Sequence, residues 1–247
     1  MFTTYTLLLL ASSLPLLGAW YARKTNRPDG LIALYAAFVV LSQIFAAKIA
    51  IFDFGFTSVT TTAATTIFAV TFLVTDMVNE KFGRRETIRM ILIAFVIQVA
   101  MVLFSLLVTK LGPAPFWNNQ GGWEAIFGIV PRITLASLIT YLVSENFDAF
   151  VYHAFRRWTR GRFLWMRNAF SSLPALTIDT VLFVTLAFAG TGIPLWPLML
   201  GQFVAKWFVG IIDIPFMYLN RLVLGRNLAA PAVTSSVSPR LPNQPVS

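Results

Sequence analysis

About seven long apolar stretches dominate this sequence, and they constrain its fold more than any other feature. A helix needs about 20 apolar residues to cross the hydrocarbon core of a bilayer. Only 12% of the 247 residues are charged, about half the share found in a soluble domain. The sequence therefore predicts an all-α, polytopic membrane protein built as a helical bundle. The predicted spans lie near residues 3–22, 30–51, 58–77, 87–109, 130–152, 168–190 and 195–221.

Basic residues gather in alternate loops between these spans. Three lie between the first two spans, four between the third and fourth, and five between the fifth and sixth, whereas "FDFGFTS" and "GTGIPLWP" contain none. Because cytoplasmic loops carry the excess of Lys and Arg, we expect the N-terminus outside and the C-terminus in the cytoplasm. These loops also account for the net charge of +9, so no nucleic-acid partner is expected.

The composition also limits the chemistry. The chain has no cysteine and a single histidine, His153, so a thiolate or multi-histidine metal site cannot form. It has no glycine-rich nucleotide-binding loop, so any transport would not be powered by ATP bound to this chain. We therefore expect neither an enzyme nor a cofactor.

Ionisable side chains inside the predicted spans are the strongest functional candidates, because each costs about 2.5–3.5 kcal/mol at the centre of a membrane helix. Asp179 lies near the middle of the sixth span and Lys206 near the middle of the seventh. A short loop makes these two spans antiparallel neighbours, so we expect the two side chains to pair. Glu145 and Asp148 lie three residues apart on one face of the fifth span.

Further polar groups are Gln43 and Lys48 on the second span and Asp213 on the seventh. In one interpretation these charges form ion pairs that only lock the bundle together. In the other they line a cavity near the membrane midplane that binds a small solute, and the excess of acids favours a solute rich in N–H donors. Threonines crowd the third span, and we interpret most of them as promoting close helix packing in preference to lining a path.

The third span ends in "FLVTDMVNEKFGRR". Its acids, Asp76 and Glu80, lie four residues apart with Asn79 beside them, and Glu80 has the spacing to pair with Arg84. Gly83 favours a turn at the end of the helix. We expect Asp76 to face the interior and to belong to an inner gate; the alternative is an ordinary charged helix end.

Five stretches together resemble the queuosine precursor transporters, the YhhQ-type family also called putative vitamin uptake transporters. They are "VVLSQIFAAKI", "TFLVTDMVNEKFGRRETIRMI", "RITLASLITYLVSENFDAFVY", "RNAFSSLPALTIDTVLFVTLAF" and "QFVAKWFVGIIDIPFMYL". The resemblance implies a six-helix core that imports 7-deazaguanines, namely queuine or its 7-cyano or 7-aminomethyl precursors, without an ATPase of its own. The positions to which it points are Asp76, Gly83, Arg132, Tyr141, Asp148, Asp179, Lys206 and Pro215.

The resulting expectations divide the chain into three parts. Residues 1–28 form an extra N-terminal transmembrane helix with a basic loop, 29–226 form the six-helix core, and 227–247 form a disordered cytoplasmic tail. The expected location is the inner membrane of a bacterial or archaeal cell, and a homodimer is left open. Two alternatives remain: a substrate-capture subunit that needs a separate energising module, and a structural membrane protein whose charges only pair helices.

The candidate residues fall into two groups. For binding a purine-like substrate they are Asp179, Lys206, Glu145, Asp148, Gln43, Lys48, Arg132, Tyr141, Asn168 and Gln202. For gating or structure they are Asp76, Asn79, Glu80, Gly83, Arg84, Asp213 and Pro215.

Overall fold

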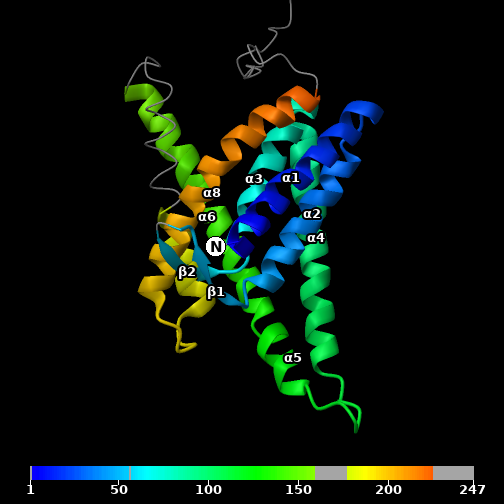
Figure 1. The fold of residues 1–247 in the computed structure, drawn as a ribbon, viewed down its shortest axis with the longest axis vertical. Helices are drawn as coiled ribbons and strands as arrows, with labels where there is room; N and C mark the ends of the chain where they lie inside the picture. Colours follow the sequence, from blue (N-terminus) through cyan, green and yellow to red (C-terminus); the bar gives the residue numbers. More distant parts are fainter. Residues whose placement is uncertain (1, 56, 159–176, 225–247) are drawn as a thin grey trace, which may run out of the picture.

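The fold is a bundle of tilted helices (Figure 1), seen in a computed structural model that describes residues 2–55, 57–158 and 177–224. Three helical stretches are long and apolar enough to span a membrane: Phe2–Thr25, Arg84–Thr109 and Gln120–Ser144. The prediction of a helical membrane protein is confirmed, while the number of spans and their orientation stay predictions. The helices are α1 (Phe2–Thr25), α2 (Asp29–Phe45), α3 (Thr65–Phe82), α4 (Arg84–Thr109), α5 (Gln120–Phe127), α6 (Val130–Trp158), Thr177–Phe188 and α8 (Leu195–Leu224).

A β-hairpin between α2 and α3 corrects the all-α prediction. Strands β1 (Ile49–Asp53) and β2 (Ser58–Thr62) pair antiparallel, in a register that runs from Ile49 opposite Thr62 to Asp53 opposite Ser58. The predicted helical spans 30–51 and 58–77 were therefore wrong where they approach each other. Hydropathy does not separate "IAIFD" from a helix, but β-branched and aromatic residues of this kind favour strands.

Local contacts close the turn of the hairpin. The backbone N–H of Gly55 donates to Asp53 Oδ1 at 2.9 Å, and Gly55 has a φ of 85°, which favours glycine. This hydrogen bond to the charged form holds the pKa of Asp53 below its ordinary value. The turn is therefore built by its own backbone and carboxylate.

The hairpin packs between α1 and α8 (Figure 1). Tyr5 on α1 donates its hydroxyl to the carbonyl of Phe54 at 2.8 Å, and the Phe54 ring lies 4.2 Å from that of Phe208 on α8. Gly201 of α8 lies directly on β2, where an added Cβ would overlap the carbonyl oxygen of Thr60. The hairpin is thus part of the packed bundle.

The other ends of α1, α3 and α8 meet at a basic pole. Lys81 Nζ of α3 donates to the carbonyl of Ala22 on α1 at 2.7 Å, and Arg23 reaches the carbonyl of Val223 on α8 at 3.3 Å. Figure 1 shows these three helix ends at the top of the molecule, with the hairpin and α5 lower down. We call this end the basic pole; it carries two of the loops that the sequence predicts to be cytoplasmic, those near Arg23 and near Arg84.

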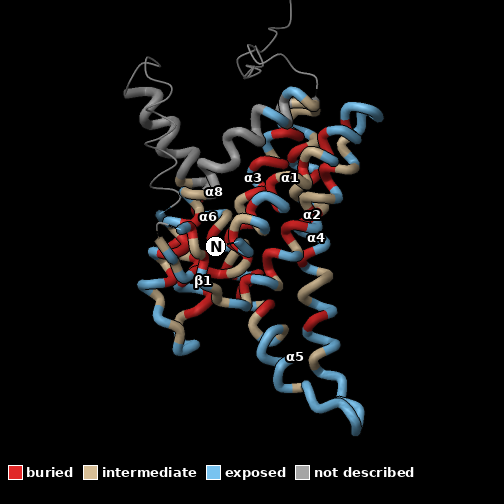
Figure 2. The backbone as a smooth tube through the Cα atoms, viewed as in Figure 1, coloured by how far each residue is buried: buried red, intermediate tan, exposed pale blue. Residues whose placement is uncertain are grey.

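Exposed apolar side chains cover the outside of the bundle. Figure 2 shows that buried residues concentrate where α1, α2 and α3 pack, whereas α5 and the far half of α4 are largely exposed. On α4, Phe104 and Leu107 are 68% and 63% exposed. An apolar surface of this extent suits contact with lipid tails rather than water.

Candidate functional site

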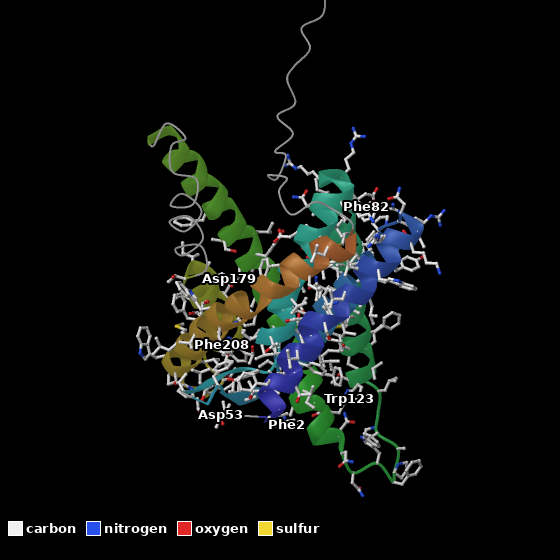
Figure 3. All side chains as sticks on the ribbon, turned by 45° about the horizontal axis from the view of Figure 1, so that its top comes forward. Phe2, Asp53, Phe82, Trp123, Asp179 and Phe208 are labelled. Carbon is white, nitrogen blue, oxygen red and sulfur yellow. The ribbon has the colours of Figure 1, made fainter. Side chains whose placement is uncertain are left out.

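An ion pair lies in the middle of the bundle. Lys206 Nζ of α8 donates to Asp179 Oδ2 on the helix Thr177–Phe188. The side chains of Lys206 and Asp179 are only 7% and 20% exposed, and Figure 3 places Asp179 between the levels of Phe82 and Trp123. The predicted pairing is confirmed, and it follows from the short link at 189–194, which folds the two helices back on each other.

A pocket surrounds this pair. It encloses about 410 Å³ of empty space, its open mouth included, and Phe68 and Phe183 form part of its apolar wall. Besides Asp179, Lys206 and Gln202, its polar lining comes from α2, β2, α3 and α6. These further polar residues are Ser42, Gln43, Thr62, Thr65, Ser137 and Thr140.

Threonine hydroxyls fix the wall where β2 leads into α3. Thr65 Oγ1 donates to the carbonyl of Thr62 at 2.9 Å and lies 3.0 Å from the hydroxyls of both Thr61 and Thr62. Because a hydroxyl has one proton, those two hydroxyls must donate to Thr65. Elsewhere in the lining, Ser137 donates to Gln43 Oε1 at 3.2 Å.

Two polar atoms of the pocket wall lack a partner among the described residues. They are Oε1 of Gln202 and Oγ1 of Thr140, whose residues are 4% and 1% exposed. A buried acceptor without a hydrogen bond costs about 1–3 kcal/mol. The pocket therefore favours a ligand or water that supplies hydrogen bonds to these groups.

The structure brings only part of the predicted binding set together. Asp179, Lys206, Gln43 and Gln202 line the pocket, but Lys48 lies exposed in the turn between α2 and β1 and does not line it. The side chains of four further candidates lie outside the described residues: Glu145, Asp148, Asn168 and Asp213. Among the gating candidates, the same holds for Glu80 and Pro215.

The acidic end of α3 holds further gating candidates. Asp76 and Asn79 are exposed, so the side chain of Asp76 is not buried among the helices, and its place in an inner gate stays a prediction. The predicted turn at Gly83 is confirmed: its φ is 85°, and α4 begins directly afterwards with the exposed Arg84. A carboxylate one turn from the basic pole can stay hydrated, so it avoids the free-energy cost of being buried in the bundle.

The sequence interpretation missed the hydroxyl residues of the site. Thr62 and Thr65 belong to the threonine run that we assigned to helix packing, and Ser137 and Thr140 were not predicted as site residues. Their spacing offered one signal: Ser137, Thr140 and the resemblance position Tyr141 share a face of one helix. Tyr141 lines a neighbouring cavity, not the central pocket.

Arg132 caps a helix instead of entering the pocket. Its Nε donates to the carbonyl of Leu186 at 2.8 Å and a terminal nitrogen donates to that of Ala189 at 2.6 Å. These carbonyls lie at the C-terminal end of the helix Thr177–Phe188, where no intrahelical donor remains and a cation interacts favourably with the helix dipole. A substrate contact of Arg132 stays a prediction.

Arg132→Ala is expected to lower the stability of the protein by about 1 kcal/mol, because Arg132 is exposed and water competes for both carbonyls. The thermal unfolding temperature of purified protein measures this loss. Arg132→Lys, which keeps the charge without the planar fork, should lie between wild type and Arg132→Ala. Loss of solute uptake at an unchanged unfolding temperature would instead favour the substrate contact.

Comparisons with known proteins agree with this architecture. The family model described as "Putative vitamin uptake transporter" matches residues 62–220. The chain is 30% identical over 168 residues to the "Probable queuosine precursor transporter" of Bacillus subtilis (strain 168), covering 67% of this chain and 73% of that protein. It is 26% identical over 167 residues to the "Queuosine precursor transporter" of Escherichia coli (strain K12), covering 67% and 72%. No solved structure matches the chain.

The pocket residues from Thr62 to Lys206 all lie within the matched region 62–220, whereas Ser42, Gln43 and Ala46 precede it. Transporter families of this kind are not enzymes, in agreement with the sequence analysis. The chain belongs to the putative vitamin uptake transporter family.

Proposed function

We propose that this protein imports a 7-deazaguanine precursor of queuosine into the cytoplasm through the central pocket, without an ATPase of its own. The carrying observation is the paired Asp179 and Lys206 beside the unpartnered acceptor of Gln202. The names of the bacterial relatives support this substrate class. The choice among queuine and its 7-cyano and 7-aminomethyl precursors is left open.

The chemistry of the pocket suits a guanine-like solute. Such a base has adjacent N–H donors along one edge, and a carboxylate such as Asp179 accepts two of them in a charge-assisted pair. The oxygen of Gln202 accepts a further N–H, and Lys206 donates to a ring carbonyl. Phe68 and Phe183 offer aromatic faces for a flat bicycle. Each group therefore has a role that a purely apolar solute would leave unused.

The test is uptake by the purified chain in liposomes, with each labelled 7-deazaguanine supplied separately. We expect saturable uptake of at least one of them, and Gln202→Leu should weaken apparent affinity about tenfold, or 1.4 kcal/mol, through loss of one acceptor. Gln120→Leu is the matched control, because Gln120 lies on α5 and hydrogen-bonds Glu124 at 2.8 Å, away from the pocket.

The outcomes separate the alternatives. Binding without uptake by the isolated chain would indicate a capture subunit that needs an energising module. Absence of both binding and thermal stabilisation by every 7-deazaguanine would favour a structural membrane protein. In cells that neither make nor import the precursor, the chain should restore queuosine in tRNA.

A further inference from the structure

A second cavity lies beside the central pocket, between α2, α3, α4 and α6. It holds about 1,040 Å³ of empty space with its mouth included, more than twice the volume of the central pocket. Three residues line both spaces: Gln43, Phe68 and Ser137. The two cavities are therefore neighbours separated by these side chains. We call the larger one the inner chamber.

The inner chamber extends from the central pocket toward the basic pole. On α3, Thr65 and Phe68 line the central pocket, whereas Phe68 to Thr75 line the chamber. On α2, the order is reversed, because that helix runs away from the basic pole: Ser42 to Ala46 line the pocket and Tyr35 to Gln43 the chamber. On both of these antiparallel helices, the residues that line the chamber therefore lie closer to the basic pole than those that line the central pocket.

Gln98 contributes a polar amide side chain to the chamber from α4, a helix whose outer surface is apolar. It lies in the middle of α4, is 8% exposed and lines the chamber. No hydrogen bond joins its side chain to another residue of the described chain. An amide at this depth costs free energy unless it forms a hydrogen bond with a partner or with water. A solute or water molecule in the chamber can supply this hydrogen bond.

Phe68 stands between the two cavities. Its ring meets that of Phe72, one turn along α3, edge to face at a centroid distance of 5.6 Å. Phe72 lines only the chamber and is 50% exposed. A rotamer change of a phenylalanine needs no backbone movement, whereas the other two shared residues, Gln43 and Ser137, are held by the hydrogen bond between them. Movement of Phe68 would therefore join the two cavities.

We infer that the inner chamber is a second, transient site for the transported flat heterocycle on its way to the cytoplasm, and that Phe68 is the gate between this site and the central pocket. Gln98 offers the solute one donor group and one acceptor, and Phe72 and Tyr141 offer aromatic faces. The inference rests on the proposed function for its solute, but the path and the gate are properties of the chain alone.

The absence of cysteine in the chain makes single-cysteine labelling a direct test. Thr75→Cys reports on the chamber and Thr140→Cys on the central pocket, with a charged thiol reagent added at the cytoplasmic face of inside-out vesicles. We expect Thr75→Cys to label readily and Thr140→Cys to label slowly. Adding Phe68→Ala should speed the labelling of Thr140→Cys by about tenfold, as loss of a barrier of about 1.4 kcal/mol would.

Phe104→Ala is the matched control, since it removes a 68% exposed aromatic ring of α4 that lines neither cavity. It should leave the labelling rate of Thr140→Cys within about twofold of its value with Phe104, a change below 0.5 kcal/mol. Phe68→Leu provides a second gate variant if Phe68→Ala is not inserted in the membrane. Equal labelling of Thr140→Cys with and without the Phe68 ring would overturn the gate.

Two further outcomes concern the chamber itself. Labelling of Thr75→Cys only from the outer face, or only by lipid-soluble reagents, would overturn its place on the cytoplasmic path. The transported 7-deazaguanine should slow the labelling of Thr75→Cys, and absence of protection by a solute that the protein does transport would overturn the second site. If no 7-deazaguanine is transported, the proposed function fails while the labelling without solute still decides the path and the gate.

Discussion

Asp179→Asn is expected to abolish solute uptake while the protein remains inserted in the membrane. The substitution removes the carboxylate that accepts from Lys206 and leaves this lysine, whose side chain is 7% exposed, without its counter-charge. Removing one partner of a buried pair typically costs about 3–5 kcal/mol, and the 20% exposure of Asp179 places the expected loss of stability at the lower end. Uptake at matched membrane expression and the thermal unfolding temperature are the two measurements.

The double variant separates a binding role from a structural one. Asp179→Asn combined with Lys206→Met removes both charges, so it should recover much of the stability. If the pair only locks helices, uptake should return as well; we expect it to stay absent, because the solute has lost its acceptor. Glu86→Gln is the control, since it breaks the pair of Glu86 and Arg89 on the exposed surface of α4. Such a pair contributes about 0–1 kcal/mol, and full uptake by Asp179→Asn alone would refute the binding role.

Gly201→Ala is expected to prevent the native fold or to destabilise it at the upper end of the 1–3 kcal/mol, occasionally more, that overpacking costs. A methyl group at this position of α8 would overlap the carbonyl oxygen of Thr60 and lie 2.6 Å from its carbonyl carbon. These atoms belong to the backbone of β2 and cannot turn aside as a side chain would. The yield of folded protein in size-exclusion chromatography and the unfolding temperature measure the effect.

Gly122→Ala is the matched control for this substitution. A Cβ at Gly122 of α5 meets no atom within 4 Å, and alanine favours a helix over glycine by about 1 kcal/mol. Gly122→Ala should therefore be neutral or slightly stabilising. A normal yield and unfolding temperature for Gly201→Ala would show that α8 does not rest on the hairpin.

Sequence reasoning predicted the features that depend on one segment or on two consecutive ones. Hydropathy located the helices, and the short link before α8 predicted the pairing of Asp179 with Lys206. It missed the hairpin because "IAIFD" and "SVTTT" continue the apolar character of their neighbours, so a window suited to membrane helices joins them to α2 and α3. Strand pairing depends on a partner segment, and a window average contains no such information.

The site was harder to predict than the fold for a related reason. Charges within a span stand out from their surroundings, so Asp179 and Lys206 were found. Sequence reasoning did not find the hydroxyl residues Thr62, Thr65, Ser137 and Thr140. A hydroxyl group in a membrane helix serves packing as often as ligand binding, and the side that it faces depends on how the helices pack in the bundle. Asp76 shows the same limit, since the sequence places it one turn before the basic residues but does not reveal that its side chain is exposed.

The contacts of α1 have a consequence for how the protein is handled. The family model begins at residue 62, which suggests that the first helix is a dispensable addition. Yet α1 is fastened at both ends: Tyr5 holds the hairpin through Phe54, and the carbonyl of Ala22 receives the amine of Lys81. Between them, Ala11 and Ala19 lie buried against neighbouring helices. The helix α1 therefore links the hairpin to the end of α3. A truncated gene that starts at residue 29 would yield a chain without these contacts, in which the apolar surface that α1 covers is exposed.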